Sequence, residues 1–219
     1  MNAWKNENLF YLTSNKSRLL KIIDHYEIYK RIINIKGDII ECGVFKGISL
    51  IRFLSFRDLL EKPKKKKIFA FDIFGKFPRP KNKKIRSQKN DVNFAINHDL
   101  KIGTGFKLEK LNSFLKKKKF SNYKLIKGDV NYTIPIFVKK NKKMKISLLH
   151  LDLDVYEPTF IALEYFYEKV TPGGIILIDD YKHIRGATLA VNDFFKNKKI
   201  KISKVSKKGR PFYIIKKLR

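Results

Sequence analysis

Short apolar runs alternate with longer amphipathic stretches along most of the chain. Runs rich in Ile, Leu and Phe predict buried strands at 39–42, 68–72, 123–126, 146–151 and 175–178. Apolar residues at helical spacing predict helices over 8–35, 48–60, 159–170 and 185–195. A turn is predicted at 172–174, and a hairpin around Gly209 is predicted from 201–205 and 212–215.

Strands that are short, apolar and β-branched, and that alternate with helices, are typical of a mostly parallel sheet covered on both faces. We therefore expect an α/β fold in a single domain over 1–219, with an N-terminal helical segment at 1–36. The least regular part is 73–110, where glycines and prolines stand among polar residues. Such a long irregular segment indicates a functional lid or short hidden helices, so we expect a lid or acceptor-binding insertion over 73–115.

The chain is strongly basic, with a net charge of +30 carried by 41 lysines and nine arginines. Arginine is the residue that reads bases and grips phosphates in a bidentate manner, so its scarcity disfavours a dedicated nucleic-acid binder. The lysines stand in blocks, including 64–67, 81–84 and 116–119, which are typical of solvated loops and helix ends. A sugar nucleotide or another mildly anionic small molecule would also be attracted by this charge.

The remaining composition favours a soluble protein. Cys42 is the single cysteine, which excludes an intramolecular disulfide and a cysteine zinc cluster. No segment approaches the roughly 18 consecutive apolar residues of a membrane span, and the N-terminus lacks the apolar stretch of a signal peptide. We expect a cytoplasmic protein that does not enter a membrane, with a homo-oligomer left open.

Carboxylates follow the predicted strands at their carboxyl ends, where open α/β sheets bind ligands. Glu41 ends the first strand and precedes a turn in which Gly43 and Gly47 allow the backbone to approach a ligand. This turn is not the Gly-x-Gly-x-x-Gly pattern of a pyrophosphate site, which disfavours a dinucleotide. Asp72 ends the next strand and is placed to accept both hydroxyls of a ribose. Asp129 is either close to an adenine edge or a simple turn residue.

The strongest segment is HLDLDVYE at 150–157, followed by Asp179 and Asp180 at the next strand end. Carboxylates crowded at adjacent strand ends repel one another, so they indicate a bound cation or protonated acids. Oxygen ligands alone favour Mg²⁺ or Mn²⁺. Asp152, Asp179 and Asp180 are the predicted ligands. For Asp154 and Glu157 the alternative is that they cap the helix predicted to begin near 159.

The four histidines carry less information than the aspartates. His25 is expected on the surface or in packing, and His150 as a hydrogen-bonded core residue in a buried strand. His183 follows Asp180 closely, so it is the histidine that we expect to contact a substrate or to act as a base.

Taken together, several stretches resemble the macrocin O-methyltransferase family. They are GDIIECGVFKG (37–47), FDIFG (71–75) with Pro78, GDVNYTIP (128–135), HLDLDVYE (150–157), PGGIILIDDY (172–181) and GATLAVNDF (186–194). The resemblance runs in order from about residue 29 to 195. It implies a Rossmann-like class I methyltransferase fold with a seven-stranded sheet and a C-terminal antiparallel hairpin. It also implies a metal-dependent enzyme that transfers a methyl group from S-adenosylmethionine to a sugar hydroxyl.

The resemblance assigns roles to individual positions. It implies Mg²⁺ ligands at Asp152, Asp179 and Asp180, with Asp152 or His183 removing the proton. The implied cofactor contacts are Glu41, Cys42, Gly43, Val44, Gly47, Ser49, Asp72, Gly128, Asp129 and Asp152. The family often has Trp where Phe45 stands and an acidic residue near Lys76, so the acceptor is open. A methyltransferase of catechol-like or other small acceptors, and a basic nucleic-acid binder on this scaffold, stand as alternatives.

Overall fold

The computed structural model describes residues 2–62, 65–79 and 88–217. Seven strands form one sheet in the order β3-β2-β1-β4-β5-β7-β6. Neighbouring strands from β3 to β5 run parallel, and β7 is antiparallel to both β5 and β6. The strands are β1 (Asp38–Cys42), β2 (Ile68–Asp72), β3 (Tyr123–Lys127), β4 (Ile146–Leu151), β5 (Val170–Ile178), β6 (Ser203–Lys204) and β7 (Phe212–Ile215). The predicted mostly parallel sheet with a C-terminal hairpin is therefore confirmed.

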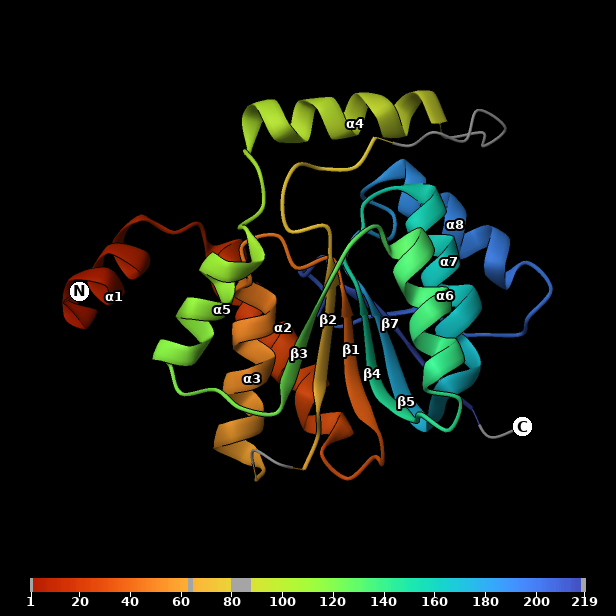
Figure 1. Ribbon diagram of the computed structural model, residues 1–219, viewed down its shortest axis with the longest axis horizontal. Coiled ribbons are helices and arrows are strands. Elements are labelled where there is room, and N and C mark those ends of the chain that lie inside the picture. Colours follow the sequence, from red (N-terminus) through yellow and green to blue (C-terminus); the bar gives the residue numbers. More distant parts are fainter. Residues whose placement is uncertain (1, 63–64, 80–87, 218–219) are drawn as a thin grey trace.

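Helices cover both faces of the sheet (Figure 1). On one face, α2, α3 and α5 contribute Ile28, Phe53 and Leu111 to a buried cluster, and on the other α6, α7 and α8 contribute Phe137, Phe166 and Val191. The helices are α1 (Ala3–Thr13), α2 (Lys16–Ile32), α3 (Ile48–Leu60), α4 (Gln88–Lys101), α5 (Leu108–Lys117), α6 (Val130–Lys140), α7 (Tyr156–Phe166) and α8 (Arg185–Phe195). None of the described helices combines the length and apolar character that crossing a bilayer demands.

Three of the predicted boundaries are wrong for local reasons. The helix predicted over 8–35 is two helices, because Ser14 and Asn15 are extended and the Asn15 side chain caps α2 at Ser17 N. The helix predicted over 159–170 begins at Tyr156 and ends at Phe166, followed by a 3₁₀ turn at Tyr167–Lys169. The turn predicted at 172–174 lies inside β5, where the register with β4 shifts.

The lysine blocks follow the prediction only in part. Lys116–Lys119 are exposed at the end of α5, as predicted. Lys66 is buried, which contradicts the solvated loop expected for 64–67, because its ammonium donates to the Ile35 carbonyl. Residue 64 and the 81–84 block lie outside the described residues.

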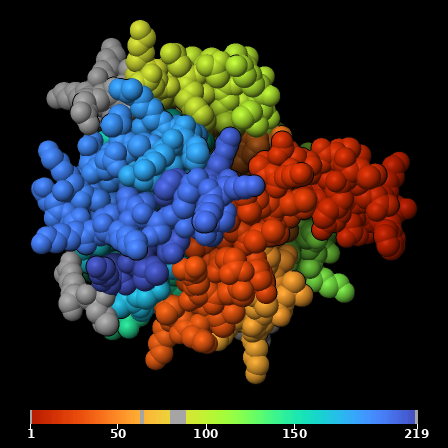
Figure 2. Space-filling model, turned by 180° about the vertical axis from the view of Figure 1, so that it is seen from behind, coloured from red at the N-terminus to blue at the C-terminus, as the bar shows by residue number. Residues whose placement is uncertain are grey.

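Two helices stand apart from this layered body. Helix α4 crosses above the carboxyl ends of the parallel strands, and α1 projects to one side (Figure 1). From behind, α1 again projects from the body and the C-terminal segments lie beside the N-terminal helices (Figure 2). Helix α4 therefore lies over the edge of the sheet where the parallel strands end, and the assignment of 73–115 as a lid stays a prediction.

Candidate metal centre and cofactor crevice

Three aspartates meet where β4 and β5 end. Asp152 directly follows β4, and Asp179 and Asp180 directly follow β5. Because the two strands are parallel neighbours, their carboxyl ends lie side by side, and each aspartate offers an oxygen within 4.8 Å of the others. Asp179 and Asp180 are buried, whereas the Asp152 side chain keeps 26% of its exposure. The site is therefore an oxygen-lined recess that opens at Asp152.

A lysine from the N-terminal part of the chain enters this recess. The Lys21 ammonium lies 2.6 Å from Asp179 Oδ2 and 3.9 Å from Asp152 Oδ2. Burial lowers the pKa of Lys21, but Asp152 and Asp179 outweigh it, so the net shift is upward. A positive charge is thus stabilised among the carboxylates. The donor set, all carboxylate oxygens with one open side, fits a hard divalent cation such as Mg²⁺.

Burial and mutual repulsion oppose the ionisation of these acids. Burial, followed by the charge of Asp179, raises the pKa of Asp152 to about 6. Burial and the neighbouring carboxylates also raise the pKa values of Asp154 and Asp180. Carboxyl groups with raised pKa values bind a cation readily, because the cation removes the repulsion that opposes their ionisation.

Asp154 and Glu157 do not cap a helix near 159 as the alternative prediction held. The N-cap of α7 is Val155, and Glu157 lies inside the first turn. Asp154 instead has a positive φ of 64° and donates its backbone N–H to Asp180 Oδ2 over 3.2 Å. Its carbonyl accepts from Ala187 N, so Asp154 joins the metal recess to α8 through its backbone.

The N–H that opens α7 is instead satisfied by α4. Asp91 Oδ2 accepts a hydrogen bond from Tyr156 N over 3.1 Å, and Asp91 is buried. A Cβ added at Gly186, in the first turn of α8, would lie 2.3 Å from Asp91 Oδ1. Asp91 therefore holds α4 against the first turns of α7 and α8.

The glycine turn after β1 is shaped by contacts within the protein. A Cβ on Gly43 would lie 1.8 Å from the Asp152 carbonyl, so a glycine is required where β1 passes β4. Gly47 is the left-handed N-cap of α3 and packs on Leu111. Cys42, Val44 and Ser49 are buried, so their predicted contacts with a cofactor stay predictions.

The Asp72 carboxylate binds this turn. Its Oδ2 accepts hydrogen bonds from Val44 N and Phe45 N over 2.7 and 3.0 Å, and its Oδ1 accepts from Phe74 N over 2.6 Å. Phe45 and Phe74 both have a φ of 53°, a conformation that side chains disfavour. Asp72 thus fixes two strained turns at the crevice, and its predicted contact with a ribose stays a prediction.

Asp129 follows the carboxyl end of β3 and stabilises the start of α6. It is the N-cap of α6, where its Oδ1 accepts from Asn131 N over 2.9 Å. Gly128 has a φ of 137° and donates to the Asp72 carbonyl. The turn-residue reading of Asp129 therefore has a direct structural basis, and its contact with adenine stays a prediction.

Glu41 and His150 face α2 from neighbouring strands. They are partners in the β1–β4 register, and both are fully buried. Burial lowers the pKa of His150, but Glu41 Oε1, 3.4 Å from His150 Nδ1, outweighs burial, so the net shift is upward. His25 of α2 packs against His150 and is fully buried, which confirms the packing alternative of its prediction and not the surface one.

The other two histidines lie on either side of the crevice. His183 is exposed, near the Phe212 ring, and burial, Arg210 and Lys204 lower its pKa. A neutral imidazole beside Asp180 remains available as a base. His98 is on α4, where its ring contacts aromatic rings including Phe45 and Phe77.

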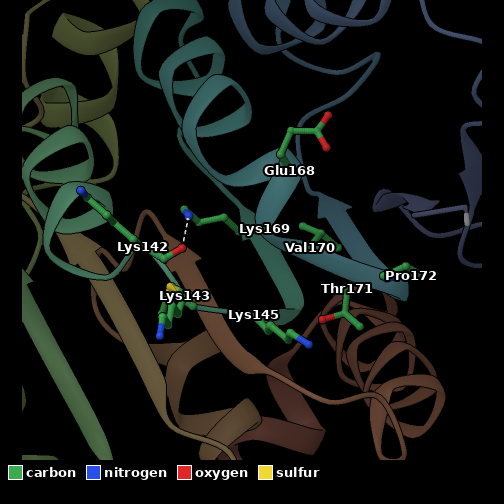
Figure 3. Close-up of a pocket in the computed structure, with 9 residues that line it drawn as sticks. Lys142, Lys143, Lys145, Glu168, Lys169, Val170, Thr171 and Pro172 are labelled. Atoms are coloured by element: carbon green, nitrogen blue, oxygen red, sulfur yellow. Dashed lines mark hydrogen bonds between the residues drawn. The ribbon is translucent and has the colours of Figure 1, made fainter. Parts of the chain in front are cut away.

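A depression of about 270 Å³ lies at the opposite edge of the sheet, at the amino ends of β4 and β5. Its lining includes several lysines, and Lys169 donates to the Lys142 carbonyl across it (Figure 3). Ligands of open parallel sheets bind at the carboxyl ends of strands. The acids at that end, and not this depression, identify the candidate site.

Sequence reasoning missed Lys21, His25 and Asp91. Lys21 and His25 are four residues apart on α2, so they share one helix face with the buried Ile28, Tyr29 and Ile32. A lysine in line with the buried stripe of a helix was the available signal. Asp91 had no such signal, because 73–110, which includes α4, shows no helical periodicity in the sequence.

Comparisons with known proteins point to one family. The sequence profile of the Macrocin-O-methyltransferase (TylF) family matches residues 15–209. The chain is 23% identical over 168 residues to the demethyldecarbamoylnovobiocin O-methyltransferase of Streptomyces niveus, covering 74% of this chain and 59% of that protein. It is 26% identical over 165 residues to a Streptomyces olivaceus 4'-O-methyltransferase of a rhamnosyl-tetracenomycin C, covering 73% and 58%. The chain thus spans less than two thirds of the length of these curated relatives.

Solved structures show the same fold. A calicheamicin methyltransferase superposes with a TM-score of 0.76 at 22% identity, covering 98% of this chain and 86% of that one. The O-methyltransferase NovP superposes with a TM-score of 0.77 at 17% identity, covering 90% and 80%. The Rossmann-like class I methyltransferase architecture is confirmed by these matches.

Proposed function

Since the chain belongs to the macrocin O-methyltransferase family, we propose that it transfers a methyl group from S-adenosylmethionine to a hydroxyl of a sugar-containing small molecule. The observation that carries the proposal is the carboxylate recess of Asp152, Asp179 and Asp180 beside the glycine turn. The relatives named above are O-methyltransferases of demethyldecarbamoylnovobiocin and of a rhamnosyl-tetracenomycin C, and the rhamnosyl group of the second favours a glycosylated acceptor.

In the proposed reaction, the acceptor oxygen forms a bond to the methyl carbon while the carbon–sulfur bond of the sulfonium breaks. The hydroxyl proton passes to Asp152, and S-adenosylhomocysteine is released. Asp152 suits this role, because its side chain is the most exposed of the three in the recess. His183 is the second candidate base, at the rim of the same crevice.

Asp152, Asp179 and Asp180 would hold a divalent cation, Mg²⁺ or Mn²⁺, which when bound lowers the pKa of a hydroxyl and fixes its position. Asp154 N orients Asp180, and Lys21 holds Asp179 from the α2 side. The turn of Gly43 and Gly47, fixed by Asp72, would receive the cofactor. Alignment of cofactor and hydroxyl in one crevice would supply much of the acceleration.

The test is calorimetric titration with S-adenosylhomocysteine, followed by methyl-transfer assays on a panel of glycosides and sugar nucleotides with and without EDTA. We expect cofactor binding in the wild type, turnover that EDTA removes, and loss of turnover but not of cofactor binding in Asp179→Ala. Glu164→Ala, which removes an exposed acid of α7, is the control for the loss of one acid. Absence of cofactor binding contradicts the methyltransferase proposal, and full activity in EDTA contradicts the metal.

A further inference from the structure

A second group of polar side chains is buried beneath the carboxylate recess. His25 of α2, Glu41 of β1 and His150 of β4 each have 0% exposure, and Asp179 has 7%. They come together because alternation along β1 and β4 turns Glu41 and His150 to the α2 face, where His25 covers them. The proposed transfer reaction requires none of these contacts.

This group leaves its polar atoms without partners. Among the described residues, neither ring nitrogen of His25 has a hydrogen-bond partner, nor has His150 Nε2, whereas His150 Nδ1 and Glu41 Oε1 face each other at 3.4 Å. Asp179 Oδ1 is equally unpartnered, although Oδ2 binds Lys21. A buried polar atom without a partner opposes folding, so such a concentration of these atoms indicates a missing ligand.

We propose that His25, His150 and Asp179 bind a second metal ion, a transition-type ion such as Zn²⁺, distinct from the divalent cation of the aspartate recess. Each of the three side chains offers a ligand atom, and these atoms all lie within 4.8 Å of one another. Tetrahedral ligands at about 2.1 Å from zinc lie about 3.4 Å apart, so small side-chain rotations close the site.

The donor set explains the choice of ion. Two imidazoles with a carboxylate favour Zn²⁺ and related ions over Mg²⁺, which prefers oxygen ligands. Glu41 Oε1 faces His150 Nδ1 at 3.4 Å, an arrangement that leaves Nε2 for the ion. Carboxylates commonly orient metal-binding histidines in this manner.

The surroundings hold the ligands in place. The Phe53 ring stacks on His25 at a centroid distance of 5.1 Å and meets His150 edge-on at 5.3 Å. Asp179 serves both sites, since Oδ2 faces Lys21 and the aspartate recess while Oδ1 is free for the second ion. The ion would bind α2 to the sheet and so fix the helix that carries Lys21.

The experiment measures Zn²⁺ and Co²⁺ binding to chelator-treated full-length protein by competition with a chromophoric chelator, together with Co²⁺ absorption spectra. We expect one tightly bound equivalent in the wild type and at least about 100-fold weaker binding in His25→Ala and His150→Ala. Glu41→Gln should bind about 10- to 100-fold more weakly, as for other residues that orient a metal ligand. His98→Ala, which alters a histidine on α4, should bind like the wild type.

Asp180→Asn separates this site from the recess, because Asp180 belongs only to the recess. It should weaken Mg²⁺ binding while leaving the Zn²⁺ equivalent intact, and His25→Ala should do the reverse. Should the variants fold poorly, NMR of ¹⁵N-histidine wild-type protein still decides: Zn²⁺ should shift the ring nitrogens of two of the four histidines. Wild-type protein without a Zn²⁺ equivalent, or equal binding in His25→Ala, overturns the proposal.

Discussion

Replacement of Asp72 by alanine tests whether this carboxylate is part of the scaffold as well as of the predicted cofactor site. Three backbone N–H groups, those of Val44, Phe45 and Phe74, donate to it over 2.6–3.0 Å. A hydrogen bond to a charged group contributes about 1.5–3 kcal/mol when measured alone. Such bonds are not additive and water replaces part of them at this half-buried site, so we expect Asp72→Ala to lower the free energy of unfolding by about 3 kcal/mol.

For a chain of this length, 1 kcal/mol corresponds to about 2–4 °C in melting temperature, so the expected decrease is about 6–12 °C. Thermal melting followed by circular dichroism, without cofactor, measures it. Asp129→Ala is the matched control, since Asp129 also follows a strand but makes the single capping bond to Asn131 N, worth about 1 kcal/mol. The reasoning is refuted if Asp72→Ala melts within about 2 °C of the wild type or no lower than Asp129→Ala.

Three further predictions concern the same crevice. Asp152→Asn, measured in EDTA, should stabilise the protein by an amount that grows from pH 4 to pH 7. Burial and a neighbouring carboxylate raise the pKa of Asp152 to about 6, so the stability that this carboxyl group contributes below its unfolded pKa is lost as the pH rises through 6. A difference in melting temperature between variant and wild type that does not change with pH would contradict this. Asp91→Ala should lower the free energy of unfolding by about 1 kcal/mol and accelerate amide hydrogen exchange in α4, measured by mass spectrometry. Unchanged exchange would show that Asp91 does not hold the helix in place. Gly43→Ala should destabilise by about 4 kcal/mol because its Cβ would meet the Asp152 carbonyl at 1.8 Å, while Gly75→Ala, which meets nothing within 4 Å, should melt like the wild type.

The sequence alone determined the layered α/β fold and the edge of the sheet that holds the acids. This succeeded because β1, β2, β4 and β5 are buried on both faces, so apolar runs mark them directly. Carboxylates such as Asp152 and Asp179 stand next to those runs, and parallel strands bring them to one edge. The helix boundaries at Asn15 and Tyr156 were missed, because they depend on caps.

Only the tertiary structure decided which partners these acids have. Asp72 holds a turn 28 residues away at Val44, and Lys21 reaches Asp179 across 158 residues of chain. The sequence left His25 either on the surface or in packing, and the structure buries it against His150. Sequence periodicity reports which face of an element is buried, but not which distant element covers it. The positions of the acids are therefore a property of the strands, whereas their charges and contacts depend on how α2 and α4 pack over the sheet.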